Sequence, residues 1–180
     1  METARVTYAV IGGAAIAVRG RVRGTRDLDL ILHSQAGPEG MDRVKKLMSD
    51  AGFAHHPRAD RHELDRVTLY RFWYPVSAAA STGVDVQVSR DALLDRAVDR
   101  ATEVVLYSAA LPVATAEDLV VLKLLSFRPI DRADAVEISL SATNFDPSYV
   151  ERCASELGLL DRWQEVKEAK LLVSGHRPES

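Results

Sequence analysis

Short apolar or alternating segments fill the first part of the chain, and longer amphipathic segments fill the last third. Five short segments predict strands, because they are rich in β-branched or aromatic residues or alternate apolar with polar positions: residues 7–11, 28–32, 67–73, 84–88 and 103–107. Between them, the pattern predicts one or two helical turns closed by Gly20, a helix over 41–51 and another over 89–100. We expect turns or loops over 33–40 and 77–83, and a loop or a hairpin tip over 54–65. We expect Pro75 to end the strand that begins at Val67.

In the last third of the chain, the sequence pattern predicts helices and no strands. Thr115 is expected to cap a helix that reaches Phe127, and Asp146 with Pro147 forms a favourable start for another that Gly158 closes. Two more helices are expected over 131–142 and 160–172. The predicted fold class is therefore α/β (α+β), a small mixed β-sheet flanked by helices with a C-terminal helical portion. We expect an α/β core over 1–114, the helical portion over 115–174 and a disordered tail over 175–180.

Composition narrows the class of protein without naming a function. The 180 residues are 47% apolar and 27% charged, which is ordinary for a globular chain and excludes a disordered or collagen-like one. The formal net charge of −3 argues against a basic nucleic-acid coat, so any anion must bind a local patch. One cysteine, Cys153, cannot form an internal disulfide, and we expect it in a helix core. With no signal-peptide pattern and no apolar run longer than 11 residues, a cytoplasmic location is predicted.

The candidate chemistry lies in residues 12–32. A strand runs into Gly12 and Gly13 and then into a helix start, where backbone N–H groups and the absence of side chains favour a bound anion. A basic loop with Arg19, Arg21, Arg23 and Arg26 follows. The sequence therefore predicts a phosphate-binding turn beside a basic loop.

Two carboxylates come directly after that loop. Asp27 and Asp29 are two positions apart in an extended segment, so they share one face about 6.6 Å apart along the strand, while Leu28, Leu30 and Leu32 face the core. Asp85 offers a third carboxylate on a later alternating strand. Hard carboxylate oxygens favour Mg²⁺ or Mn²⁺, and three such acids suit two metals about 4 Å apart for in-line displacement at phosphorus.

These residues together resemble the DNA polymerase β-like nucleotidyltransferase superfamily. The resemblance rests on the glycine pair, the basic loop, the D-x-D pair and the later lone acid: Gly12, Gly13, Asp27, Asp29 and Asp85. The segment EDLVVLKLLSFRPIDRADAV is similar to one in the small bacterial abortive-infection and type IV toxin-like members, with Lys123, Arg128, Asp131 and Asp134 at the matching positions. Ile130 departs from the pattern, since those relatives often carry lysine there. The resemblance covers roughly residues 8–138.

The resemblance implies a metal-dependent transfer of a nucleoside monophosphate from a nucleoside triphosphate to an acceptor hydroxyl. It implies that Asp27, Asp29 and Asp85 bind the metals and that the glycine turn holds the triphosphate. We further expect phosphate contacts from Arg19, Thr25, Arg26, Lys123 and Arg128, and a catalytic contribution from Lys123 and Asp131. An RNA or tRNA end, a protein side chain and a small molecule all stay open as the acceptor. The site is expected in the cleft between the acidic sheet face and the C-terminal helices.

Structural interpretations of the same residues stay open. Asp27 and Asp29 could form a solvated strand face paired with arginines, and Lys123 could serve only as an ion-pair partner of Asp131 or Asp134. A dinucleotide-binding domain is a weaker alternative, because the third glycine of its fingerprint is missing. A catalytically silent module of the same fold that binds a protein partner, as in a toxin–antitoxin pair, is the main alternative function. Against it, three acids gathered without a cation would cost stability.

Overall fold

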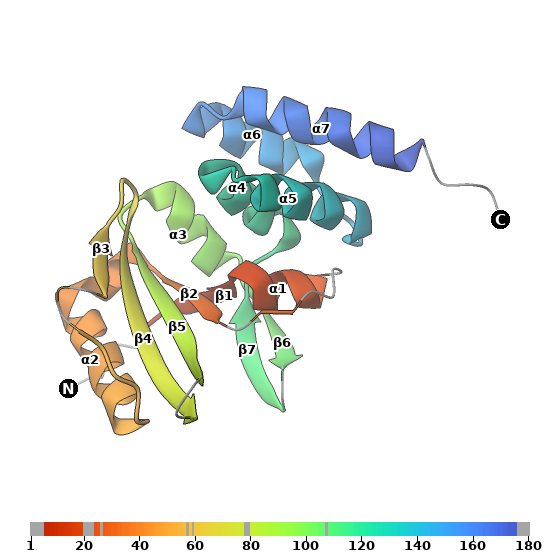
Figure 1. Cartoon of the computed structure of the whole chain (residues 1–180). Coiled ribbons are helices and arrows are strands. Elements are labelled where there is room, and N and C mark those ends of the chain that lie inside the picture. The colour runs from red at the N-terminus through yellow and green to blue at the C-terminus, as the bar shows by residue number, and fades with distance from the viewer. Residues whose placement is uncertain are drawn as a thin grey trace. The chain divides into compact units, whose positions relative to one another are not determined.

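One mixed sheet organises the N-terminal part of the molecule (Figure 1). The computed structural model describes residues 6–19, 24–25, 27–56, 58, 60–77, 80–106 and 108–175. Within these ranges the sheet has the strand order β3-β4-β5-β2-β1-β7-β6. Its strands are β1 (Tyr8–Ile11), β2 (Leu28–Leu32), β3 (Arg61–Glu63), β4 (Val67–Ser77), β5 (Ala80–Ser89), β6 (Thr102–Leu106) and β7 (Ala109–Val113). The mixed sheet confirms the predicted fold class.

The helices follow the sequence signals in most places. They are α1 (Gly12–Arg19), α2 (Gly37–Asp50), α3 (Ala92–Asp99), α4 (Ala116–Ser126), α5 (Pro129–Ser141), α6 (Pro147–Leu157) and α7 (Leu160–Ser174), with a short 3₁₀ turn at Ser34–Ala36. Thr115 caps α4 by accepting a hydrogen bond from the Asp118 N–H, and Asp146 caps α6 in the same way. Gly158 ends α6 with φ +70°, a conformation that favours glycine.

The chain divides into two compact units, and the division falls within α1. The first unit comprises Met1–Ala14 and Gly24–Ala114, and the second comprises Ala15–Arg23 and Thr115–Ser180. The second unit groups the end of α1 with α4 to α7. None of the helices in the described part of the chain has the length and hydropathy of a membrane span.

The core of the first unit lies between α2 and one face of the sheet. Leu32, Met41, Phe72, Val84 and Val86 are its buried residues, and Leu28 and Leu30 pack against them. The predicted inward orientation of the three leucines of β2 is therefore confirmed. Because neighbouring strand residues point to opposite faces, Asp29 on β2 and Asp85 on β5 face away from this core.

Strand directions exclude the dinucleotide-binding alternative. β1 pairs with β2 antiparallel, whereas a dinucleotide-binding βαβ unit needs a parallel pair on either side of its first helix. β2 in turn pairs with β5 in parallel, from Leu28 opposite Val84 to Leu32 opposite Val88. The glycine pair thus opens α1 within a different topology.

Several predicted boundaries were wrong. β4 continues through Pro75 to Ser77, and β5 begins at Ala80, so much of the predicted loop over 77–83 belongs to a long hairpin. Pro75 is tolerated because β3 pairs only with the first part of β4, which leaves β4 without a ladder partner on that side at Pro75. α2 and α5 each begin earlier than predicted, since Pro38 and Pro129 occupy first-turn positions where a missing N–H costs nothing.

Two strands were missed altogether. β3 lies within the predicted loop over 54–65, and β7 was not predicted at all. Residues 176–180, most of the predicted tail, lie outside the described residues. Cys153 is buried in α6, as predicted.

Candidate active site

Asp29 and Asp85 are directly opposite each other on the parallel strands β2 and β5. Arg71 on β4 is in turn directly opposite Asp85. Residues in register on neighbouring strands point to the same face, so the three side chains form a row across three strands. The structure therefore brings two of the three predicted acids side by side.

Arg71 supplies a positive charge to this row of side chains. Its Nε donates to Asp85 Oδ1 at 2.6 Å and its Nη2 donates to Oδ2 at 2.5 Å, an arrangement that uses both oxygens of a carboxylate that is 8% exposed. These hydrogen bonds raise the pKa of Arg71, against the effect of burial, and the charges of Asp27 and Asp29 act in the same direction. The charges of all three predicted acids thus act on one guanidinium group. Sequence reasoning missed Arg71, although a lone arginine in the apolar strand pattern of VTLYRFW is a signal for such a partner.

Gly12 is required by the position of Asp29. A Cβ atom on Gly12 would lie 2.0 Å from Asp29 Oδ2, and Gly12 has φ +63°. Gly13 is similarly close to Thr25, because a Cβ atom added to Gly13 would lie 2.9 Å from the Thr25 Cβ. Because no side chain stands between the first turn of α1 and these residues, the glycine pair and Asp29 form one continuous surface.

Asp27 lies just before β2, beside Gly83 of β5. The Gly83 N–H donates to Asp27 Oδ1 at 3.0 Å, and the Thr25 hydroxyl donates to the Asp27 carbonyl oxygen at 2.9 Å. A Cβ on Gly83 would lie 2.8 Å from the same carboxylate oxygen. Gly83 is directly opposite Trp73 on β4. The guanidinium carbon of Arg71 lies over the Trp73 ring, 5.4 Å from the ring centroid.

The donor set suits a hard divalent cation that its substrate helps to bind. Within the described ranges, no three or more His, Cys, Asp or Glu side chains are grouped so that they could hold a metal ion. Mg²⁺ in phosphate-handling sites usually takes only one or two protein carboxylates and completes its shell with phosphate oxygens and water. Asp27 and Asp29 supply two carboxylates, and both oxygens of Asp85 accept hydrogen bonds from Arg71.

A second charged cluster lies in the helical unit. Lys123 on α4 donates to Asp131 Oδ1 at 2.7 Å and lies 3.0 Å from Asp134 Oδ2, and both acids are fully buried in α5. Arg128 Nε also donates to Asp131, at 2.7 Å. Burial alone would raise the pKa of Asp131, but the hydrogen bonds from Arg128 and Lys123 outweigh it and hold the pKa well below its usual range. The contacts that the ion-pair interpretation of Lys123 requires are therefore present. A contact between Lys123 and a nucleotide stays a prediction.

The remaining candidates belong to the basic loop. Arg19 ends α1, where burial lowers its pKa and the nearby carboxylate of Glu117 opposes that shift. Thr25 is exposed. Arg21, Arg23 and Arg26 lie outside the described residues.

A mixed sheet that presents paired acids beside a glycine-opened helix defines a nucleotidyltransferase class of protein. Comparison with family models agrees, since residues 3–135 match the model described as "Nucleotidyl transferase AbiEii toxin, Type IV TA system". The match covers well over half of the chain, and the chain belongs to this nucleotidyltransferase family. No curated protein matches the chain.

A similar fold occurs in a solved structure at low sequence identity. An antigenic nucleotidyltransferase-like protein from Paracoccidioides brasiliensis superposes with a TM-score of 0.50 and 16% identity, covering 88% of this chain and 84% of that one. The antibiotic-resistance factor ANT(2'')-Ia gives a TM-score of 0.47 with 14% identity, covering 95% and 86%. The lincosamide antibiotic adenylyltransferase LnuA, solved with lincomycin, gives 0.44 with 16% identity, covering 74% and 86%.

Proposed function

We propose that this nucleotidyltransferase moves a nucleoside monophosphate from a nucleoside triphosphate to an acceptor hydroxyl, with Mg²⁺ or Mn²⁺ held by Asp27 and Asp29. The acceptor oxygen forms a bond to the α-phosphorus, the bond between the α- and β-phosphates breaks, and pyrophosphate leaves. The observation that carries the proposal is the juxtaposition of Asp29, Asp85 and Gly12 on one surface. A divalent cation bound there would neutralise the triphosphate and increase the electrophilicity of the α-phosphorus.

Each side chain has a distinct part in this proposal. The first turn of α1 at Gly12 and Gly13 receives the triphosphate, because backbone N–H groups at a helix start favour an anion and these two residues carry no side chain of their own. Asp85 orients the acceptor hydroxyl and accepts its proton, and Arg71 holds Asp85 in place until the acceptor arrives. Arg19, Thr25, Arg26, Lys123 and Arg128 are proposed phosphate contacts, and Asp131 positions Lys123.

The acceptor belongs to one of three classes: an RNA or tRNA end, a protein side chain or a small molecule. We propose a cytoplasmic location, because the lone cysteine is buried and suits a reducing compartment.

Calorimetric titration with each nucleoside triphosphate, with and without Mg²⁺, tests the proposal. The wild type should bind at least one triphosphate only when Mg²⁺ is present. The Asp27→Asn/Asp29→Asn variant should lose that binding, because both proposed metal ligands become neutral amides. Asp65→Asn is a suitable control, since Asp65 is a 95% exposed carboxylate away from the site. Unchanged binding by the double variant would exclude this metal site.

A silent partner-binding module is the alternative function, and Arg71 is the observation that favours it. Arg71 already supplies one positive charge among the acids, so part of their repulsion is offset without a bound cation. The sequence-based argument against this alternative is weaker as a result. The family description names a toxin of a type IV toxin–antitoxin system, which suggests an antitoxin protein as a partner. Absence of triphosphate binding by the wild type, with and without Mg²⁺, would favour this alternative.

A further inference from the structure

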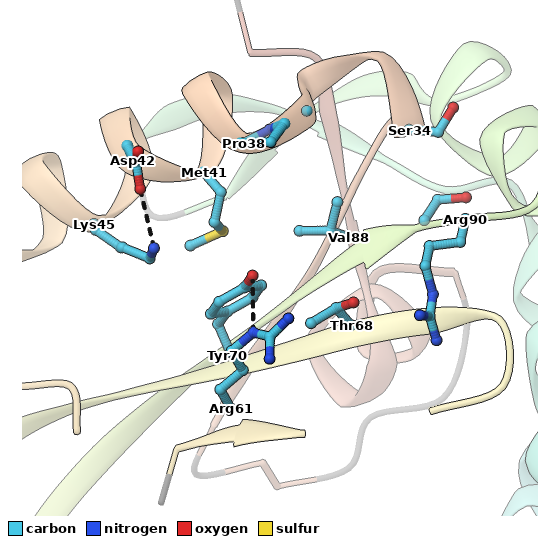
Figure 2. A pocket seen from close by; sticks show the side chains of 12 residues that line it. Ser34, Pro38, Met41, Asp42, Lys45, Arg61, Thr68, Tyr70, Val88 and Arg90 are labelled. Carbon is cyan, nitrogen blue, oxygen red and sulfur yellow. Dashed lines mark hydrogen bonds and ion pairs between the residues drawn. The ribbon is translucent and has the colours of Figure 1, made fainter. Parts of the chain in front are cut away.

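A cavity of about 440 Å³ lies on the other face of the sheet, between α2 and strands β3 to β5 (Figure 2). Tyr70 lines it, whereas its neighbour Arg71 belongs to the acidic row, and successive strand residues point to opposite faces. From α2 the lining residues are Gly37, Pro38, Met41, Asp42 and Lys45, which form one helical stripe. The cavity belongs entirely to the first unit and is separate from the candidate active site.

At one end of the cavity, three of the lining residues donate hydrogen bonds to the carboxylate of Glu63. Arg61 and Arg90 both donate to this carboxylate, Arg90 at 2.8 Å, and the Thr68 hydroxyl donates to it at 3.0 Å. Arg61, Thr68 and Arg90 all line the cavity. Two guanidinium groups and a hydroxyl that converge on one anionic group are the donors that a phosphate group requires.

The charges around the cavity favour an additional anion. Among the residues that the structure describes, the three cations Lys45, Arg61 and Arg90 pair with two carboxylates, those of Asp42 and Glu63. α2 also begins at the cavity wall, and no side chain caps its N-terminus. The positive end of the helix dipole therefore adds to the surplus positive charge.

The rest of the cavity suits a planar ring. Met41 and Val88 supply apolar surface beside Tyr70, whose ring lies 5.4 Å from Lys45 Nζ and 5.7 Å from the Arg61 guanidinium carbon. Figure 2 shows Met41 pointing from α2 toward the strand that carries Tyr70. Aromatic, thioether and aliphatic side chains together favour contact with an aromatic base.

We propose that this cavity binds a free nucleoside monophosphate. Its phosphate replaces the Glu63 carboxylate between Arg61 and Arg90, and its base lies against Tyr70 and Met41. The volume falls within the usual range for small-molecule sites, about 300–1,000 Å³. One phosphate replaces one carboxylate, so the site suits a monophosphate better than a triphosphate. Glu63 is exposed on a three-residue edge strand, and it can move aside without disturbing the core.

Calorimetric titration with AMP tests this proposal. The protein used is the Asp27→Asn/Asp29→Asn variant in excess EDTA, which removes the proposed metal-dependent triphosphate site from the measurement. Arg61→Gln, made in this background, should weaken AMP binding by about tenfold or more, because it removes a charge-assisted contact. Glu63→Gln should tighten it about threefold or more, because the internal competitor loses its charge. Lys46→Gln is the matched control, since Lys46 is exposed and pairs with Asp50 outside the cavity.

Two further ligands separate the parts of the site. Ribose 5-phosphate lacks the base and adenosine lacks the phosphate, so each should bind about tenfold or more weakly than AMP. The proposal is overturned if AMP does not bind this background, if Arg61→Gln binds AMP as the Lys46→Gln control does, or if ribose 5-phosphate equals AMP. Failure here leaves the proposed nucleotidyl transfer intact, because that function is measured by Mg²⁺-dependent triphosphate binding to the wild type. The Arg61→Gln protein should keep its melting temperature within a few degrees, since Arg61 is exposed.

Discussion

Arg71 and Asp85 are joined by two hydrogen bonds across β4 and β5, so the candidate active site contains its own cation. Asp85 also lies next to Asp29 on β2. In the protein without ligand, the guanidinium group of Arg71 therefore compensates part of the negative charge of the acids. The sequence alone had suggested that a bound metal would do this. The two means of compensation can be separated experimentally.

Replacing Arg71 with methionine should lower the free energy of unfolding by about 1–3 kcal/mol, because Asp85 is left nearly buried without its cation. The lower end of that range applies if water reaches the pair, since the Arg71 side chain is 36% exposed. Millimolar Mg²⁺ should restore part of the loss, because a divalent cation then supplies the missing charge. Urea unfolding with EDTA and with Mg²⁺ measures both effects.

Arg132→Met is the control for this experiment. Arg132 forms an exposed ion pair with Glu165 at 2.9 Å, and its loss should change stability by less than about 1 kcal/mol with no response to Mg²⁺. If Mg²⁺ stabilised both variants equally, the cation would act on the protein surface rather than at the acidic row.

The acids and glycines could be singled out from the sequence because their signals are local. Asp27 and Asp29 are separated by the strand period, and Gly12 follows a strand directly, so short-range pattern was sufficient. Arg71 and Gly83 were missed because their importance arises only from register. Arg71 is opposite Asp85, and Gly83 donates to Asp27 across β5 and β2, pairings that no single strand encodes.

The missed strands have a similar physical explanation. β3 is three exposed residues, Arg61–Glu63, whose composition gives no apolar signal, and its strand conformation depends on pairing with β4. β7 runs from Ala109 to Val113 and contains Pro112, which reduces strand propensity in isolation. In both cases tertiary pairing outweighs local preference.

Gly12→Ala tests whether the glycine turn must lie against Asp29. The added methyl group would lie 2.0 Å from Asp29 Oδ2, so the carboxylate or the start of α1 must move. We expect a stability loss of about 2 kcal/mol or more, part of it from the positive φ, together with loss of Mg²⁺-dependent triphosphate binding. Thermal unfolding and calorimetry measure the two effects.

Gly158→Ala provides the comparison for backbone strain alone. Gly158 has φ +70° and open space around its Cβ position, so only the conformational cost of about 1 kcal/mol should appear. Triphosphate binding should persist in this variant. If Gly12→Ala behaved like Gly158→Ala in both assays, the close approach to Asp29 would have no functional consequence.

Lys123→Met should destabilise the protein by about 3 kcal/mol, because it leaves Asp134 and Asp131 buried with fewer partners. The pKa of Asp131 is depressed in the folded state, so its stabilising effect is present above its unfolded pKa and is lost as the pH falls through the folded value. The variant should therefore unfold at a higher pH during acid titration than the wild type. Circular dichroism between pH 7 and pH 2 measures the two midpoints, and identical midpoints would contradict the assignment. Lys167→Met, which removes an exposed lysine 3.6 Å from Glu151, is the control.

Tyr149 should control the alkaline limit of stability. Its hydroxyl donates to Asp118 Oδ1 at 2.6 Å, and burial, followed by that hydrogen bond, raises its pKa in the folded state. In the unfolded chain Tyr149 ionises near pH 10, so its stabilising effect is fully present below that pH and declines as the pH rises further.

Tyr149→Phe should lower the free energy of unfolding by about 1–2 kcal/mol at pH 8, because Asp118 loses a donor while keeping its hydrogen bond from Thr115. The difference between the two proteins should then shrink between pH 10 and pH 11.5 in urea unfolding experiments. Tyr74→Phe is the control, since Tyr74 is 42% exposed on β4. A constant difference for Tyr149→Phe across the same pH range would show that the Asp118 contact does not depend on the neutral phenol.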